Sequence, residues 1–321
     1  MIIILFSIIF ALIILLIERS IGIGLDYHPD TLTYLEFSDE TLKNSFIENP
    51  FNFIGSFFYV WVGFFNKNTF IIITINILVF AITNLILYLG VKNILNKQNN
   101  FYLILSLLLI FDPYRAHLSL HILKDTLIIF SLISTLYFIN NKFFFIPSIF
   151  SVIFGMLLRF NFYGYLLIIV SFLKNKNFYI LFILFFIIIP FVPFELDELD
   201  DFSEKGSLAF RDFDKIPNFV NFNYPFGEIL RGLTWPIIRV FNFAFLFHPI
   251  YIIFTIQSLA FTFLFFYNKN YLNLNILLFY LTLAVIASAA PGYNSYLRYT
   301  QPVVTALYLW VIVNSNFKKK A

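Results

Sequence analysis

Long apolar runs separated by short polar gaps make up most of the chain. Runs such as "MIIILFSIIFALIILLI" and "TFIIITINILVFAITNLILYLG" approach or exceed the roughly 20 residues that a helix needs to cross a bilayer. Transmembrane β-strands would instead alternate in polarity over segments of about ten residues, and the sequence lacks that alternation. Cutting the chain at its polar gaps predicts about ten apolar helices, near residues 2–17, 69–90, 100–112, 122–140, 143–158, 161–173, 177–194, 249–267, 273–290 and 300–315.

The composition predicts the same fold class. Of the 321 residues, 60% are hydrophobic and 12% are charged, whereas a soluble globular domain carries about 25% charged residues. We therefore predict an all-α, polytopic membrane helix bundle that forms one integral membrane domain over residues 1–321. The first segment lacks a lysine or arginine before its apolar run and a small-residue cleavage pattern after it, which favours a retained helix over a removable signal peptide.

The polar gaps are of two kinds, and their difference predicts the topology. In one kind every charged residue is a lysine, whereas the other kind holds all 18 acidic residues and all the arginines. Because cytoplasmic loops carry the excess of positive charge, we expect the lysine-only gaps and both termini to face the cytoplasm. Two long loops, at about 18–68 and 195–248, then lie outside. We expect any chemistry at this outer face.

The stretch "HLSLHILKD" places ionisable residues at the outer mouth of the fourth predicted segment. His117, His121 and Lys124 follow i, i+4, i+7 spacing, which predicts one shared helix face with Asp125 beside it. Such groups normally face a bundle interior or a wet cavity, although an interfacial helix end is the alternative. The spacing of His117, His121 and Asp125 would also allow a metal ion, but no strong metal signature accompanies it. We predict no metal and no cofactor.

Arginines lie at the outer ends of several apolar segments. Arginine stays charged and binds phosphate through a planar fork, so the set indicates a phosphate or pyrophosphate ligand; pairing with the outer acids is the alternative. Arg159 has no acid nearby in sequence, so its partner must come from another helix or from a ligand. The predicted substrate-binding residues are Arg115, Lys124, Asp125, Arg159, Arg231, Arg239, Tyr293, Arg298 and Tyr299.

The first long loop supplies candidate bases. In "GIGLDYHPDTLTY", Asp26 and Asp30 lie among aromatic residues, where a carboxylate could accept a proton from a sugar hydroxyl. The alternative is an ordinary acidic turn, with Pro29 and Asp30 starting a short surface helix. Asp26, Asp30 and His121 are the predicted catalytic candidates. The sequence has no P-loop, GxGxxG or Gly-x-Ser-x-Gly motif, so nothing in it supports ATP-driven transport.

Four motifs carry a resemblance to a known family. "DYHPDTLTY", "LKDTLIIF", "LLRFNFYGYLL" and "YLRYTQP" resemble the Wzy and EpsG-like repeat-unit polymerases of bacterial polysaccharide clusters, and more distantly GT-C-type glycosyltransferases. The resemblance implies an O-antigen, capsule or exopolysaccharide polymerase at the periplasmic face of the bacterial inner membrane. Its implied partners are an undecaprenyl-pyrophosphate-linked oligosaccharide, membrane lipid and a chain-length regulator, without nucleic acid.

The resemblance also implies residue roles. Arg159 and Arg298 would hold the donor pyrophosphate, assisted by Arg231 or Arg239, and one of the three catalytic candidates would be the base. The chain departs from the family in being short and in its strongly acidic second loop, "FELDELDDFSEKGSLAFRDFDK". Two alternatives remain: a GT-C-type enzyme that adds one sugar from a lipid-phosphate donor, and a transporter. The transporter is disfavoured because the sequence shows no internal repeat.

Overall fold

The computed structural model shows helices throughout the part of the chain that it describes. That part comprises residues 1–24, 27–38, 40–48, 55–95, 100–139, 145–159, 165, 168–169, 250–267, 278–279, 282–283 and 293–315. Its helices are α1 (Ile2–Ser20), α2 (Pro29–Phe37), α3 (Glu40–Glu48), α4 (Phe57–Phe64), α5 (Thr69–Leu95), α6 (Asn100–Ile110), α7 (Pro113–Ser119), α8 (Asp125–Phe138), α9 (Phe145–Leu158), α15 (Ile250–Tyr267) and α17 (Tyr293–Ser315). The predicted all-α class is confirmed for these residues.

Within the residues that the structure describes, three stretches are long and apolar enough to cross a membrane: Ile2–Ser20, Thr69–Asn93 and Asn100–Ser119. Large apolar side chains on their outer surfaces are left uncovered by the rest of the chain. Leu5 and Leu16 of α1, for example, are 59% and 70% exposed. The total of about ten crossings and their orientation stay predictions, and the predicted helices at 177–194 and most of 161–173 and 273–290 lie outside the described residues.

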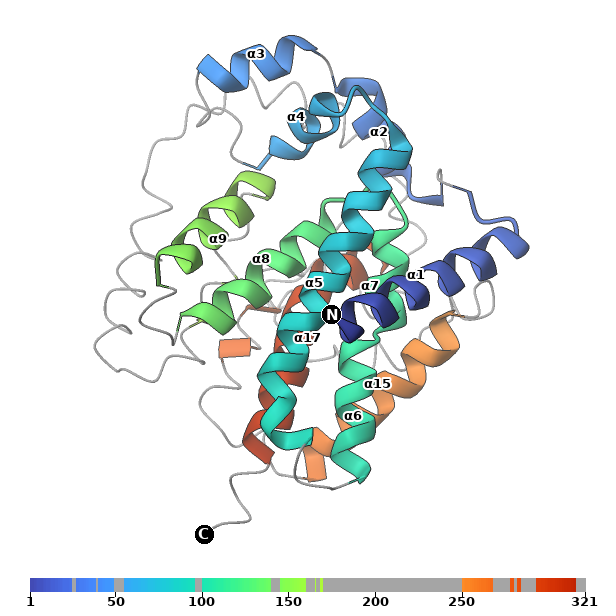
Figure 1. The fold of residues 1–321 in the computed structure, drawn as a ribbon, viewed down its shortest axis with the longest axis vertical. Helices are drawn as coiled ribbons and strands as arrows, with labels where there is room; N and C mark the ends of the chain where they lie inside the picture. Colours follow the sequence, from blue (N-terminus) through green and yellow to red (C-terminus); the bar gives the residue numbers. More distant parts are fainter. Residues whose placement is uncertain are drawn as a thin grey trace, which may run out of the picture.

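Helix α5 is the central element of the described bundle (Figure 1). It packs against α1, α6, α7, α8 and α17, and α8 in turn packs against α9 and α17. The short helices α2, α3 and α4 lie together at one end of this bundle, where α4 contacts α9. The core between these elements is aliphatic and aromatic, with Leu87, Leu132 and Val303 fully buried.

The chain breaks its helix twice between α6 and α8. Asp112 caps the start of α7 by accepting hydrogen bonds from the backbone N–H groups of Tyr114 (2.8 Å) and Arg115 (3.1 Å). Pro113 occupies the first helical position, where its missing N–H costs nothing. Helix α7 ends at Ser119, and α8 begins only at Asp125.

The prediction that His117, His121 and Lys124 share one helix face is therefore wrong. His117 lies on α7, His121 lies in the turn that follows, and Lys124 is the residue just before α8. A side chain from another helix stabilises this turn, because Asn76 Nδ2 donates to the carbonyl oxygens of His121 (3.0 Å) and Leu123 (3.5 Å). Helical spacing within the segment could not reveal that partner.

Two other helix starts bear on the candidate residues. Helix α2 begins at Pro29, as the alternative interpretation of the first loop predicted, so Asp30 lies in its first turn. Helix α17 begins at Tyr293 and not near residue 300, so Arg298 and Tyr299 lie inside a helix instead of in a turn before it.

The helix ends assigned to one face by charge come together in the fold. The carboxyl ends of α1, α7 and α9 meet the start of α8 and the first part of α17, as the contacts described below show. Which side of a membrane this end faces stays a prediction.

Candidate functional site

A buried group of charged side chains occupies this end of the bundle. We call its five residues, Asp30, Lys124, Asp125, Arg159 and Arg298, the arginine cluster. Ion pairs join the two aspartates to the two arginines, and Lys124 directly precedes Asp125. Asp125 is fully buried at the first position of α8. Its Oδ1 accepts a hydrogen bond from Arg159 Nη2 (3.0 Å), and its Oδ2 accepts from Arg298 Nε (3.1 Å) and Nη2 (2.8 Å). One carboxylate thus holds two guanidinium groups from separate helix ends.

Arg298 also reaches the edge of the cluster. Its Nη2 donates to Asp30 Oδ2 at 2.7 Å, and the Asp30 side chain retains 13% of its exposure. Arg298 therefore bridges a buried carboxylate on α8 and a more accessible one on α2. Charge-assisted contacts of this kind are among the stronger hydrogen bonds in proteins.

Backbone contacts of Gly55 position Lys124 and the end of the helix that precedes Arg159. Gly55 has a φ of 89°, a conformation that glycine tolerates and other residues rarely adopt. Its N–H donates to the carbonyl oxygens of Met156 (3.1 Å) and Leu157 (2.9 Å) at the end of α9, just before Arg159. Its own carbonyl oxygen accepts from Lys124 Nζ at 3.4 Å.

Tyrosines surround the cluster. The Arg159 guanidinium carbon lies 3.9 Å from the centre of the Tyr299 ring, and Tyr165 Oη donates to the Tyr299 carbonyl oxygen at 2.9 Å. On α2 and α4, burial and the nearby Asp30 charge raise the pKa of Tyr34, and raise the pKa of Tyr59 to about 12. Both phenols therefore stay protonated at neutral pH and remain hydrogen-bond donors.

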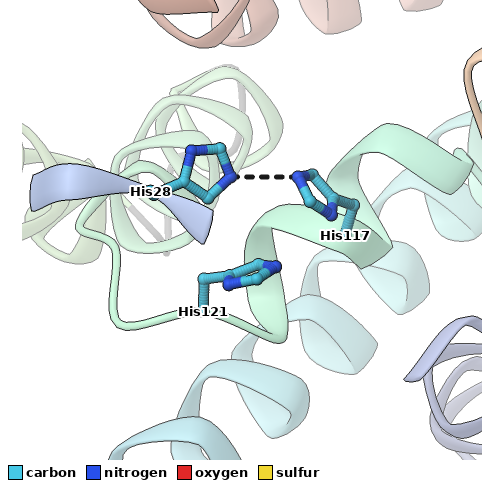
Figure 2. A group of neighbouring side chains, drawn as sticks. All are labelled: His28, His117 and His121. Carbon is cyan, nitrogen blue, oxygen red and sulfur yellow. Dashed lines mark hydrogen bonds between the residues drawn. The ribbon is translucent and has the colours of Figure 1, made fainter. Parts of the chain in front are cut away.

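Glu18 and three histidines form a second buried group, which we call the histidine cluster. His117 Nδ1 lies 2.6 Å from Glu18 Oε1, and His117 Nε2 lies 3.0 Å from His28 Nε2. His121 Nε2 lies 3.4 Å from Glu18 Oε2. Figure 2 shows His28 and His117 pointing toward each other, with the His121 ring beside them. One ring nitrogen from each histidine lies within 4.8 Å of the other two, a spacing that could hold a metal ion.

The two clusters share two segments of chain. His28 immediately precedes α2, which carries Asp30, and His121 lies in the turn that leads to Asp125. The alternative metal set of His117, His121 and Asp125 is not the one that the fold brings together, because Asp125 is held by the two arginines. His28 takes its place beside the other two histidines.

Arg115 lies apart from both clusters and has a local role. Its Nη2 donates to the carbonyl oxygens of Leu109 and Ile110 at the end of α6, and its Nε lies 3.6 Å from Asp112 Oδ2. Gln301 Nε2 donates to that same aspartate oxygen at 2.7 Å. These contacts join the end of α6, the start of α7 and α17, and they give Arg115 partners within its own segment.

The predicted site residues besides Arg115 fall into four groups. Asp30, Lys124, Asp125, Arg159 and Arg298 come together, with Tyr299 stacked on one arginine, whereas His121 belongs to the histidine cluster. Tyr293 is the first residue of α17. Asp26, Arg231 and Arg239 lie outside the described residues.

Two residues of the histidine cluster, Glu18 and His28, were not predicted from the sequence. Glu18 stands at the end of the first apolar run, in "LIERS", where a glutamate one residue from an arginine resembles an ordinary interfacial pair. His28 lies in the motif "DYHPD" but received no role. The signal that could have identified Glu18 is an acidic residue at the last turn of an otherwise apolar helix.

Comparison with known proteins found no matching family model, no matching curated protein and no matching solved structure.

The arginine cluster has the charge balance of an anion site. Among the described residues it combines three cations with two carboxylates, so it carries an excess positive charge in a largely buried setting. Arg159 Nη1 is buried and makes no hydrogen bond within the described part of the chain. A phosphate oxygen would satisfy this donor and offset the excess charge.

Proposed function

We propose that the chain is an integral membrane glycosyltransferase that polymerises undecaprenyl-pyrophosphate-linked repeat units at the periplasmic face of the bacterial inner membrane. The observation that carries the proposal is the pairing of Arg159 and Arg298 on Asp125, 173 positions from Arg298 in the chain. Buried ion pairs contribute little to stability in comparison with apolar packing of the same volume. A network assembled from such distant segments is better explained by ligand binding.

The leaving group defines what the arginines would do. In the proposed step, a hydroxyl oxygen of the acceptor glycan attacks the anomeric carbon of the donor, and the bond from that carbon to the pyrophosphate oxygen breaks. The lipid pyrophosphate departs with the bonding electron pair. Arg159 and Arg298 stabilise the negative charge that develops on it, while Asp125 holds both guanidinium groups in place.

Asp30 is the candidate base in this scheme. The hydroxyl proton must go to a nearby acceptor, and Asp30 is the more accessible of the two carboxylates in the arginine cluster. In the free protein it accepts a hydrogen bond from Arg298. A pyrophosphate that binds Arg298 would compete for that donor and release Asp30 to accept the proton. His121, the other described candidate, lies in the histidine cluster instead.

Tyr59 would bind the sugar, because it is only partly buried and lies close enough to Asp30 for the carboxylate charge to raise the pKa of its phenol. Tyr34 is buried and packs against the Tyr59 ring, so it would position Tyr59. A tyrosine offers an apolar ring face for stacking on a sugar and a hydroxyl for hydrogen bonding.

The test is the length distribution of surface glycan. A strain without the gene is complemented with wild type, Arg159→Ala or Arg298→Ala, and the glycan is separated by size beside an immunoblot of membrane protein. We expect the wild type to restore a ladder and each variant to leave single repeat units at a normal protein level. Arg19→Ala is the matched control, because Arg19 is exposed and its side chain donates to the nearby Ile23 carbonyl oxygen.

A different outcome would identify the alternative enzyme. If the gene-deleted strain keeps its ladder but lacks one sugar in every repeat, polymerisation is excluded and single-sugar transfer by a GT-C-type enzyme takes its place.

A further inference from the structure

We propose that the histidine cluster binds one Zn²⁺ ion through His28, His117 and His121, with Glu18 orienting His117. This site goes beyond glycosyl transfer and does not depend on it. It also departs from the prediction, made from sequence, that no metal is bound.

The hydrogen bond that Glu18 accepts fixes the tautomer of His117. A carboxylate can only accept, so the 2.6 Å contact requires the proton to reside on His117 Nδ1. His117 Nε2 is then left with a lone pair, and it faces His28 Nε2 at 3.0 Å. A carboxylate behind a ligating histidine is the usual outer partner in zinc sites, where it raises the basicity of the ligand.

The separation of His28 and His117 suits two ligands of one ion. Nitrogens that bind zinc at about 2.0–2.1 Å with tetrahedral angles lie about 3.3 Å apart. The observed 3.0 Å needs only a slight widening. Without metal, His28 Nε2–H would donate to the lone pair of His117 Nε2. On zinc binding the His28 proton would move to its Nδ1, so that each Nε2 offers a lone pair to the ion.

His121 supplies the third ligand. Its ring is buried, and neither nitrogen makes a hydrogen bond within the described part of the chain, although Nε2 lies 3.4 Å from Glu18 Oε2. A buried polar atom without a partner is costly. Its backbone is held in place by Asn76 and by the Leu123 N–H, which both donate to the His121 carbonyl oxygen. A metal ion would satisfy the ring that the fold leaves in this position.

The ligand set favours zinc over the harder cations. Imidazole suits Zn²⁺ and neighbouring transition metals, whereas Mg²⁺ and Ca²⁺ prefer oxygen ligands. Three histidines leave a fourth position for water or for a Glu18 oxygen. Because His28 precedes α2 and His121 lies in the turn between α7 and α8, the ion would tie the segment that carries Asp30 to the turn that leads to Asp125.

The experiment measures zinc on the purified full chain. Protein in detergent is stripped with a chelator, dialysed and titrated with ZnCl₂ by calorimetry, and the metal content after gel filtration is measured by mass spectrometry. We expect about one zinc ion per chain, as a single three-histidine site requires. Failure of the wild-type protein to bind zinc would overturn the proposal.

Variants locate the ion. We expect His28→Ala and His121→Ala each to weaken zinc binding by more than about 100-fold, and Glu18→Gln to weaken it by about 10–100-fold while the stoichiometry at saturation stays the same. Ser106→Ala is the control, since it removes a different buried polar atom, on α6, and should bind zinc as the wild type does. Zinc affinity that is unchanged in both histidine variants would place any bound ion elsewhere and refute the site.

Co²⁺ absorption, measured on the wild-type protein, keeps the site testable if the variants fold poorly. Co²⁺ in a four-coordinate site gives strong visible absorption, which reports on ligand geometry in the wild-type protein itself. We expect that absorption on titration with CoCl₂ and its loss when ZnCl₂ is added. A weak spectrum of six-coordinate type would contradict the three-histidine site.

Discussion

The two buried clusters occupy neighbouring positions but balance their charges in different ways. The arginine cluster joins fully charged groups, and Asp125 makes contacts with two guanidinium groups at once. The histidine cluster sets a single carboxylate, Glu18, against three imidazoles that can be neutral. The arginine cluster is suited to an anion that takes the place of a carboxylate beside the guanidinium groups. The histidine cluster is suited to a cation that takes the place of a proton on the imidazoles.

The comparison predicts the largest loss of stability at Asp125. Asp125→Ala leaves two buried guanidinium groups without their shared partner, and we expect the free energy of unfolding to fall by about 3–5 kcal/mol. Thermal or denaturant unfolding of the purified protein in detergent measures the loss. A change below about 1 kcal/mol would show that water or another group replaces the carboxylate easily.

Glu18 should matter less than Asp125. Glu18→Gln keeps the shape of the side chain but replaces a carboxylate that accepts from His117 with a neutral amide. We expect a loss of about 1–3 kcal/mol in metal-free protein, the range for a buried hydrogen bond to a charged group. The same unfolding assay compares the two variants directly. A loss at Glu18 equal to that at Asp125 would remove the distinction between the clusters.

Asp112 provides a structural reference outside both clusters. Asp112→Asn keeps an oxygen that can cap α7 but removes the negative charge beside Arg115 Nε and Gln301 Nε2. We expect a loss of about 0.5–2 kcal/mol, because Arg115 keeps its hydrogen bonds to the Leu109 and Ile110 carbonyl oxygens. At matched protein level the glycan ladder should stay like that of the wild type. Loss of the ladder at normal stability would instead assign Asp112 a direct part in the reaction.

Asp30 should combine the smallest effect on stability with a large effect on activity. Its carboxylate keeps 13% side-chain exposure, so Asp30→Asn should cost less than about 1 kcal/mol. As the proposed base, however, it should reduce polymer formation by about 10²–10⁴-fold. Incorporation of labelled repeat units into polymer by membrane vesicles measures the rate. A rate within a factor of two of the wild type would exclude Asp30 as the base.

The long apolar helices and much of the arginine cluster could be predicted from sequence, because apolar length and charge placement are properties of single segments, whereas the short helices α3 and α4 inside the first predicted loop could not. The start of α5 at Thr69 and the shared location of Arg159 and Arg298 followed from those patterns. The break between α7 and α8 could not, since it depends on Asn76 from another helix. Asp125 could not be predicted as the partner of Arg159 for the same reason, since it lies on a different helix.

The histidine cluster shows the limit of spacing as a guide. His117 and His121 have helical spacing, which suggested Asp125 as their neighbour. The turn after α7 moves Asp125 to the arginines instead. Arg115 is buried near the end of an apolar segment, as the arginines of the arginine cluster are. Its side chain nevertheless donates to the Ile110 carbonyl oxygen at the end of α6. Residue type and depth alone did not separate these roles.

We propose that the buried charges of the arginine cluster are retained for binding rather than for stability. The most direct test replaces three of them together, as Asp125→Leu, Arg159→Met and Arg298→Met in one chain. Buried ion pairs exchanged for apolar residues of similar volume often leave stability unchanged or raised. We expect this protein to unfold at or above the temperature of the wild type and to restore no glycan ladder in the gene-deleted strain. A folded triple variant that restores the full ladder would contradict the claim.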